Sequence, residues 1–184
     1  MKSEKPIALT RDCTAVLIPS GETIVLPAGS SIWLRQSLGG SYTVMTDHGH
    51  MARIDARDGD VLGLPQAEPK TEHRGGAETA EAAERLVWEQ LRNCYDPEIP
   101  VNIVDLGLIY ECTVRPAGAG GYKASVRFTL TAPGCGMGQF LAQDIRSKLL
   151  AVPAISEADV ELVWDPPWNQ SRISGAAKQQ LGIE

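Results

Sequence analysis

The chain has 184 residues, of which 43% are hydrophobic and 22% charged, values typical of a soluble globular protein with one or two domains. The net charge of −6, with no cluster of Lys and Arg beside aromatic residues, argues against nucleic acid as a partner. The longest apolar runs, such as Ala15–Ile18, are far shorter than the roughly 20 residues of a membrane-spanning helix, so no membrane association is expected.

The N-terminal residues, MKSEKPIALTRD, lack the apolar core of a signal peptide, so a cytoplasmic protein is expected. Thiols remain reduced in that compartment. The chain has four cysteines, and no two of them form a C-x-x-C pair. Their wide spacing favours free thiols over a disulfide framework. The cysteines are Cys13, Cys94, Cys112 and Cys135.

Residues 1–64 contain short apolar runs separated by turn residues such as Pro, Gly and Asp. Gly and Asp permit the backbone angles of tight turns, and regular short strands at this spacing are typical of a small β-meander or barrel. The predicted strands are Ala15–Ile18, Thr23–Leu26, Ser31–Leu34, Tyr42–Met45, Met51–Ile54 and Val61–Leu64. The first predicted domain therefore covers residues 1–64.

Residues 65–79, PQAEPKTEHRGGAET, are rich in Pro, Gly and charge and have no apolar periodicity, which predicts a linker. Residues 80–94 regain a helical period, with apolar side chains three and four positions apart. Pro97 ends this helix, because the residue before a proline disfavours the helical region.

The remaining residues predict two strands, a helix, a third strand and a short terminal helix. Alternating apolar residues from Leu108 to Val114 and from Tyr122 to Leu130 predict an antiparallel hairpin. A helix follows Gly136, with Met137, Phe140, Leu141, Ile145 and Leu149 on its buried face. Val160, Leu162 and Trp164 predict the third strand, and Ser174 caps a helix through Leu181. Residues 80–184 therefore form a two-layer α/β sandwich, and the whole chain is α+β.

Cys135 lies between a predicted strand and a predicted helix, with Gly134 and Gly136 on either side. Glycines allow a ligand or partner to approach the backbone closely. The N-terminus of a helix carries a partial positive charge, which favours the thiolate that binds metals or attacks electrophiles. The alternative is a buried cysteine that packs as a small hydrophobic residue.

The rest of the sequence restricts what such a thiolate could do. A cysteine hydrolase needs a nearby histidine base, but all three histidines precede residue 80, so no catalytic residue is assigned and an enzyme is disfavoured. The paired spacing of a closed zinc site is absent, as is a convincing four-cysteine cluster site. A single thiolate holds iron or a cluster only weakly, which suits a transfer factor better than an enzyme with a resident cluster.

Two further groups of residues could bind a metal or a partner. The carboxylates of Asp96, Glu98 and Asp105 lie close together in sequence, although each could simply cap a turn or face solvent. Trp164 and Trp168 flank an Asp-Pro-Pro segment and could anchor a protein partner. Alternatively, Trp164 completes a core strand and Trp168 packs over its end.

Three segments together resemble the metal–sulfur cluster assembly factor domain, which also occurs in PaaD of phenylacetate degradation. They are DPEIPVNIVDLGLIY at residues 96–110, LTAPGCGM at residues 130–137 and WDPPW at residues 164–168. The resemblance covers about residues 80–184. In the first domain, Ile18–Glu22, Gln36–Val44 and Leu62-Gly63 resemble the N-terminal extension of the SufT family. Gly136 also fits the SufT type, because many PaaD-like proteins have proline after the cysteine.

The resemblance implies an accessory role in the maturation of iron–sulfur proteins. It implies that Cys135 is the functional cysteine, a transient ligand of iron or an iron–sulfur cluster, and that Asp96, Glu98 and Thr131 lie in its neighbourhood. The implied partners are cluster scaffolds and client apoproteins, and a homo-oligomer is left open. Two alternatives remain: an adaptor that docks scaffold to client without binding metal, and a thiol-dependent enzyme.

Overall fold

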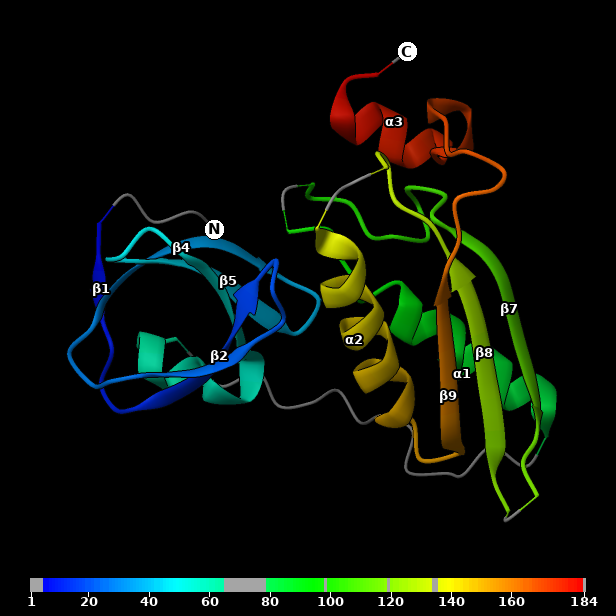
Figure 1. Ribbon diagram of the computed structural model, residues 1–184, viewed down its shortest axis with the longest axis horizontal. Coiled ribbons are helices and arrows are strands. Elements are labelled where there is room, and N and C mark those ends of the chain that lie inside the picture. Colours follow the sequence, from blue (N-terminus) through cyan, green and yellow to red (C-terminus); the bar gives the residue numbers. More distant parts are fainter. Residues whose placement is uncertain (1–4, 65–78, 98, 119, 134–135, 184) are drawn as a thin grey trace. The chain divides into compact units, whose positions relative to one another are not determined.

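The computed structural model divides the chain into two compact units, Met1–Glu72 and His73–Glu184, each of which is described by itself (Figure 1). The structure describes residues 5–64, 79–97, 99–118, 120–133 and 136–183. The predicted linker, residues 65–79, therefore lies almost entirely outside the described residues. No helix in these ranges is both long and apolar enough to span a membrane.

The first unit is a six-stranded antiparallel sheet that curls round its own core (Figure 1). β1 and β2 follow each other along the chain, yet β1 pairs with β4 whereas β2 pairs with β3 and β6. This pairing confirms the predicted barrel-like β domain. The strands are β1 (Ile7–Ala8), β2 (Cys13–Ile18), β3 (Thr23–Leu26), β4 (Ser31–Leu38), β5 (Ser41–Thr46) and β6 (Met51–Asp55).

The strand predicted at Val61–Leu64 was wrong. Val61 and Leu62 instead end the 3₁₀ segment η1 (Ala56–Leu62). The Asp55 carboxylate accepts the Arg57 N–H at the start of this segment, and Gly63 ends it in the left-handed conformation with φ 66°. Both Val61 and Leu62 are buried, so an apolar run this short fits a helical turn as well as a strand.

The second unit has two layers, a three-stranded sheet and two helices that contact both the sheet and each other. The sheet order is β7-β8-β9, with β7 antiparallel and β9 parallel to β8. This arrangement confirms the predicted hairpin and the predicted α-β-β-α-β order. The elements are α1 (Ala80–Leu91), β7 (Ile109–Pro116), β8 (Tyr122–Phe128), α2 (Met137–Leu150), β9 (Ile155–Leu162) and α3 (Gly175–Leu181).

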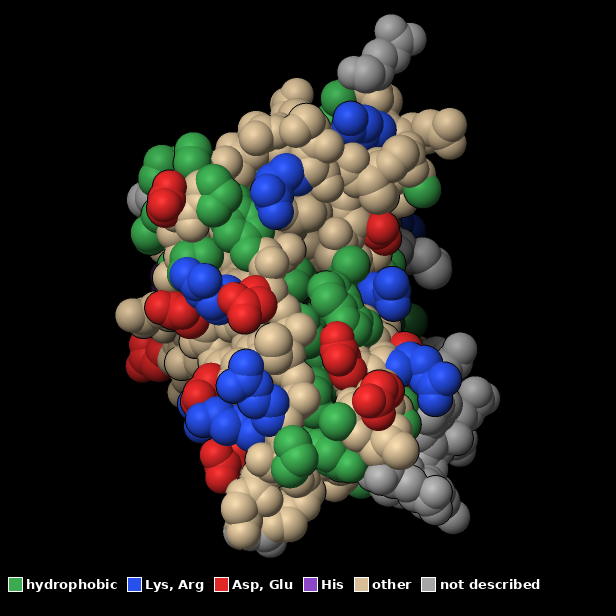
Figure 2. Space-filling view, turned by 90° about the vertical axis from the view of Figure 1, so that its right-hand side faces the viewer, with side chains coloured by type: hydrophobic (Ala, Val, Ile, Leu, Met, Phe, Trp, Pro, Cys, Tyr) green, Lys and Arg blue, Asp and Glu red, His purple; other side chains and the backbone are tan. Residues whose placement is uncertain are grey.

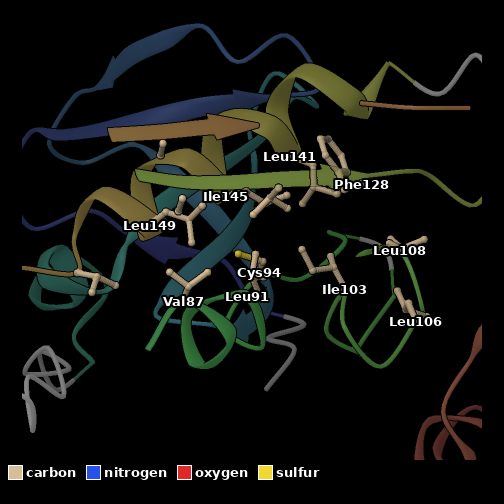
Figure 3. Close-up of a cluster of buried hydrophobic side chains, with 14 of the residues drawn as sticks. Val87, Leu91, Cys94, Ile103, Leu106, Leu108, Phe128, Leu141, Ile145 and Leu149 are labelled. Atoms are coloured by element: carbon tan, nitrogen blue, oxygen red, sulfur yellow. The ribbon is translucent and has the colours of Figure 1, made fainter. Parts of the chain in front are cut away.

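The core of the second unit lies between the helices and the sheet (Figure 3). Side chains from α1, α2 and β8 meet there with apolar side chains from the loop that precedes β7. That loop is therefore anchored by burial rather than by regular secondary structure. The fully or nearly fully buried residues include Val87, Leu91, Cys94, Ile103, Leu106, Leu108, Phe128, Leu141, Ile145 and Leu149.

Of the two elements predicted near the C-terminus, the helix cap at Ser174 is confirmed, whereas the extension of the third strand to Trp164 is wrong. Ser174 caps α3 as predicted, since its hydroxyl accepts the Ala177 N–H at 3.2 Å. The third strand, however, ends at Leu162, and Trp164 is 44% exposed instead of facing the core. Pro166 and Pro167 follow closely and have no N–H to donate to a sheet, so strand pairing stops before them.

Candidate functional site

Cys135, Gly134 and Glu98 lie outside the described residues, so the site is described from the residues around them. Gly136, which follows Cys135 in the sequence, is the N-cap of α2. It has no side chain to accept the N–H groups of the first helical turn. These N–H groups give the start of α2 a partial positive charge that would stabilise a nearby anion such as a thiolate.

The start of α2 is packed tightly against the end of β9. A Cβ atom added at Gly138 would lie 2.6 Å from Cδ2 of Leu162, a separation that requires the leucine to move. Thr131, which precedes the cysteine segment, is half-buried. These contacts fix the start of α2 at the end of the sheet where β8 and β9, being parallel, both finish.

Sequence reasoning did not single out Thr129, a buried polar residue just after β8. It is 1% exposed, and its hydroxyl oxygen has no hydrogen-bond partner among the residues that the structure describes. Its N–H donates to the Leu108 carbonyl at 2.9 Å, which continues the pairing of β7 and β8 beyond β8. No sequence signal marks this residue, because it follows the strict alternation of β8 and is polar like the other residues of its face.

The three described cysteines are buried or partly buried. Cys13 and Cys94 are buried, and burial raises the pKa of Cys13. Burial, with a smaller contribution from the Glu84 carboxylate, raises the pKa of Cys112 to about 12. The two described cysteines of the second unit, Cys94 and Cys112, both pack on its core. At neutral pH Cys13 and Cys112 therefore remain protonated, a form that binds metal weakly.

Asp105 and Asp96, the described members of the acidic group before β7, take part in local structure. Asn102 Nδ2 donates to Asp105 Oδ2 at 2.6 Å, while the Asp105 N–H donates to Asn102 Oδ1 at 2.9 Å. Asp96 is half-buried, and its carbonyl accepts the Ile99 N–H. The Asp105 carboxylate therefore stabilises a turn, as a side chain in an Asx-type arrangement does.

Three consecutive carbonyls in this turn each receive a donor from the C-terminal segment, residues 166–180. The Asp105 carbonyl accepts the Ser174 N–H at 2.8 Å. The Leu106 carbonyl accepts Trp168 Nε1–H at 2.9 Å, and the Gly107 carbonyl accepts Arg172 Nε–H at 3.3 Å. We call this set of contacts the C-terminal clamp.

Tyr110 and Gly107 complete the clamp. The Tyr110 hydroxyl donates to the Pro166 carbonyl at 2.7 Å, and the Arg172 guanidinium lies 4.1 Å from the centre of the Tyr110 ring. Gly107 has φ 69°, and an added Cβ would lie 2.3 Å from the Arg172 carbonyl oxygen. The clamp therefore joins two of the three segments that carry the family resemblance, residues 96–110 and 164–168.

The two tryptophans of the WDPPW segment have different environments. Trp168 is partly buried on the core and donates to Leu106, so it has a structural role. Trp164 is one of three large hydrophobic side chains that are exposed in the described part of the chain, the others being Val25 and Leu150. Trp164 is therefore available to a partner, and Trp168 is largely occupied by the clamp.

No group of three or more His, Cys, Asp or Glu side chains that could hold a metal ion occurs within the described ranges. Iron–sulfur clusters are usually held by four cysteines. The described residues therefore provide no complete site for a metal or cluster.

Comparisons with known proteins place the second unit in a family. A family model described as "Iron-sulfur cluster assembly protein" matches residues 84–162. An "Fe-S protein maturation auxiliary factor" from Porphyromonas gingivalis is 41% identical over 100 residues, which cover 54% of this chain and 91% of the relative. The "Fe-S protein maturation auxiliary factor SufT" from Staphylococcus aureus is 38% identical over 88 residues, covering 48% of this chain and 96% of that protein.

The fold has a solved counterpart. The crystal structure of a Domain of Unknown Function DUF59 from Bacillus anthracis matches with a TM-score of 0.50 and 37% identity, covering 57% of this chain and 96% of that chain. The family model falls within the second unit, so the likeness of residues 1–64 to the SufT extension stays a prediction. The matched residues cover 91% and 96% of these two relatives, at 41% and 38% identity. The chain therefore belongs to the iron–sulfur cluster assembly protein family and is SufT-like, as its motifs predict.

Proposed function

We propose that this protein is an accessory factor in iron–sulfur protein maturation and that Cys135 transiently binds the iron or cluster in transit. The general role is supported by the family and by relatives whose names describe maturation auxiliary factors. These names describe factors rather than enzymes, and no catalytic step is assigned to the chain.

The observation that carries the role of Cys135 is the contrast among the cysteines. Cys13, Cys94 and Cys112 are buried or packed on a core, and the pKa of Cys112 is raised to about 12. Cys135 directly precedes the uncapped start of α2, where the helix dipole favours a thiolate. Cys135 is therefore the cysteine best suited to bind a soft metal.

The cargo would need ligands from outside this chain. A single thiolate supplies one of the four ligands that a cluster usually has, and the described residues offer no grouped donors to supply the others. A scaffold or client with its own cysteines would complete the ligand set. Weak binding by one ligand suits transfer, because the cargo must also leave.

The test is an anaerobic titration of the purified chain with a cluster-loaded scaffold, followed by separation and measurement of iron per chain. The wild type and Cys112→Ser should acquire cluster, whereas Cys135→Ser should not. Cys112→Ser is the matched control, since it removes a thiol that is packed on the core. Acquisition of cluster by Cys135→Ser at the wild-type level would refute the proposal.

A second candidate function, an adaptor that docks scaffold to client without binding metal, is favoured by the exposed side chain of Trp164. Exposed tryptophans are common anchors of protein interfaces. Trp164→Ala should then weaken binding to scaffold or client, while Cys135→Ser should not. If neither the wild type nor Cys135→Ser acquires cluster but both still bind the scaffold, the adaptor function replaces the carrier function.

The thiol-dependent enzyme remains the weakest candidate. The second unit contains one histidine, His73, which lies outside the described residues. His48 and His50 belong to the first unit and are exposed. Turnover of an electrophilic substrate that depends on Cys135 would revive this candidate.

A further inference from the structure

The three-stranded sheet of the second unit has an open edge at β7. In the order β7-β8-β9, β7 pairs only with β8 among the described strands. Figure 2 shows this side of the molecule, where hydrophobic side chains lie between groups of both charges. An open antiparallel edge presents unpaired N–H and carbonyl groups to which another strand can add.

The backbone of β7 shows which residues face outward. The Ala117 N–H donates to the Gly121 carbonyl, in the same register that pairs Thr113 with Ser125. Because hydrogen-bonding direction alternates along a strand, Glu111, Thr113 and Arg115 direct their backbone groups inward to β8. Cys112 and Val114 therefore direct theirs outward.

The usable part of this edge is short and symmetric. At one end the register shifts between Ile109 and Glu111, where the strand is irregular. At the other end Pro116, the next outward position, has no N–H to donate. The edge available for pairing is therefore residues 111–115, centred on Thr113.

On the face opposite the helices, one cation has no ion-pair partner among the described residues. Lys123 contacts Asp159 at 2.6 Å, and Arg127 contacts Glu161 at 3.1 Å and Glu111 at 3.5 Å. Arg115, by contrast, is exposed and forms no ion pair with any described residue. Its cross-strand neighbour on β8 is another cation, Lys123. Like charges placed opposite each other destabilise a sheet, so a carboxylate beside Arg115 would relieve this repulsion.

We propose that β7 pairs antiparallel with β7 of a second copy of this chain, about a two-fold axis at Thr113. This register places Arg115 opposite Glu111 of the second copy, and Glu111 opposite its Arg115. Cys112 and Val114 then exchange backbone hydrogen bonds across the axis, and their partly buried side chains meet on the helix-covered face. The result is a continuous six-stranded sheet.

The occupant is a second copy because the edge is self-complementary. In a two-fold contact about Thr113, position 111 of each copy faces position 115 of the other copy. Glu111 is an anion and Arg115 is a cation, so both facing pairs are attractive. An unrelated strand would have to supply the same charges in the same order. The proposal does not depend on metal binding by Cys135.

The first test is the mass of the full-length chain in solution, measured by light scattering over a range of concentrations. The wild type should rise from 19.8 kDa toward twice that value. Arg115→Glu should raise the dimer dissociation constant by about tenfold or more, because two attractive cross-strand pairs become repulsive. Arg146→Glu, an equal charge change at an exposed position on α2, should leave the dimer intact.

The second test locates the axis. Thr113 would face itself across a non-hydrogen-bonded pair, with Cα atoms about 4.5 Å apart, within the roughly 4.4–6.8 Å range of disulfides. In a Cys135→Ser background, Thr113→Cys should cross-link into a covalent dimer under copper-catalysed air oxidation. Ser125→Cys, on the central strand opposite Thr113, is the control that should remain monomeric.

Three outcomes would overturn the proposal. The first is a wild type that stays at 19.8 kDa up to millimolar concentration. The second is a dimer that is equally stable in Arg115→Glu. The third is cross-linking of Ser125→Cys as fast as that of Thr113→Cys.

Discussion

Replacing Gly107 by alanine tests whether the C-terminal clamp is as tight as its geometry indicates. Gly107 has φ 69°, a conformation that costs an ordinary residue about 1–2 kcal/mol. The new Cβ would also lie 2.3 Å from the Arg172 carbonyl oxygen and 2.6 Å from Arg172 Cβ. Neither Arg172 atom can rotate away without moving the backbone.

Relief of this clash would displace the segment that donates to three consecutive carbonyls. Each hydrogen bond of this kind contributes about 0.5–1.5 kcal/mol to stability. Loss of one or two of them, added to the conformational strain, gives a destabilisation of about 1.5–5 kcal/mol for Gly107→Ala, with a central value of about 3 kcal/mol.

Gly182→Ala is the matched control. Gly182 has φ 68° at the end of α3, and no atom lies within 4 Å of an added Cβ. The free energy of unfolding of Gly182→Ala should therefore fall only by the cost of the left-handed backbone conformation, about 1–2 kcal/mol. The difference between the two variants isolates the contact with Arg172.

The assay is urea unfolding followed by tryptophan fluorescence in a Trp33→Phe background. Trp33 is the one tryptophan of the first unit, so the remaining signal comes from Trp88, Trp164 and Trp168 in the second. If Gly107→Ala is no more destabilising than Gly182→Ala, the close approach of Arg172 to Gly107 is wrong.

Three further predictions concern the same unit. Tyr110→Phe should cost about 1 kcal/mol in urea unfolding, because it removes only the hydroxyl that donates to Pro166. Trp168→Phe should also lower the free energy of unfolding by about 1 kcal/mol or more, because it removes the hydrogen bond to Leu106. Trp164 is exposed, so Trp164→Ala should change stability by about 0.5 kcal/mol or less, and equal effects of the two variants would contradict the different environments of the two tryptophans. For Cys112, with a pKa raised to about 12, the unfolded thiol ionises first, so stability should fall from about pH 9 upward, and Cys112→Ala should abolish this part of the fall in a pH series.

Regular elements were predictable where the local pattern was long. β8 alternates buried Ala124, Val126 and Phe128 with polar residues, a period that identifies a strand and its inner face. α3 was identified by its cap at Ser174. By contrast, the three apolar residues Val61, Leu62 and Leu64 were too few to separate a 3₁₀ turn from a strand.

The clamp could not be read from the sequence. Its donors and acceptors are 56 to 65 residues apart for Tyr110, Trp168 and Arg172, and no local period connects them. The acceptors are also backbone carbonyls, which any residue carries. Cys135, the residue that the motifs favoured most directly, remains a prediction because it lies outside the described residues, and so does Glu98.

The long sequence separation in the clamp also sets an order for folding during synthesis. The first unit has all its strands once residue 55 has been made, so it can fold while translation continues. In the second unit, the carbonyls of residues 105–107 wait for donors at residues 168–174. A ribosome adds about 5–20 residues per second, so this turn stays unpartnered for several seconds. Chaperones that bind nascent chains would therefore meet the second unit with this turn still unclamped.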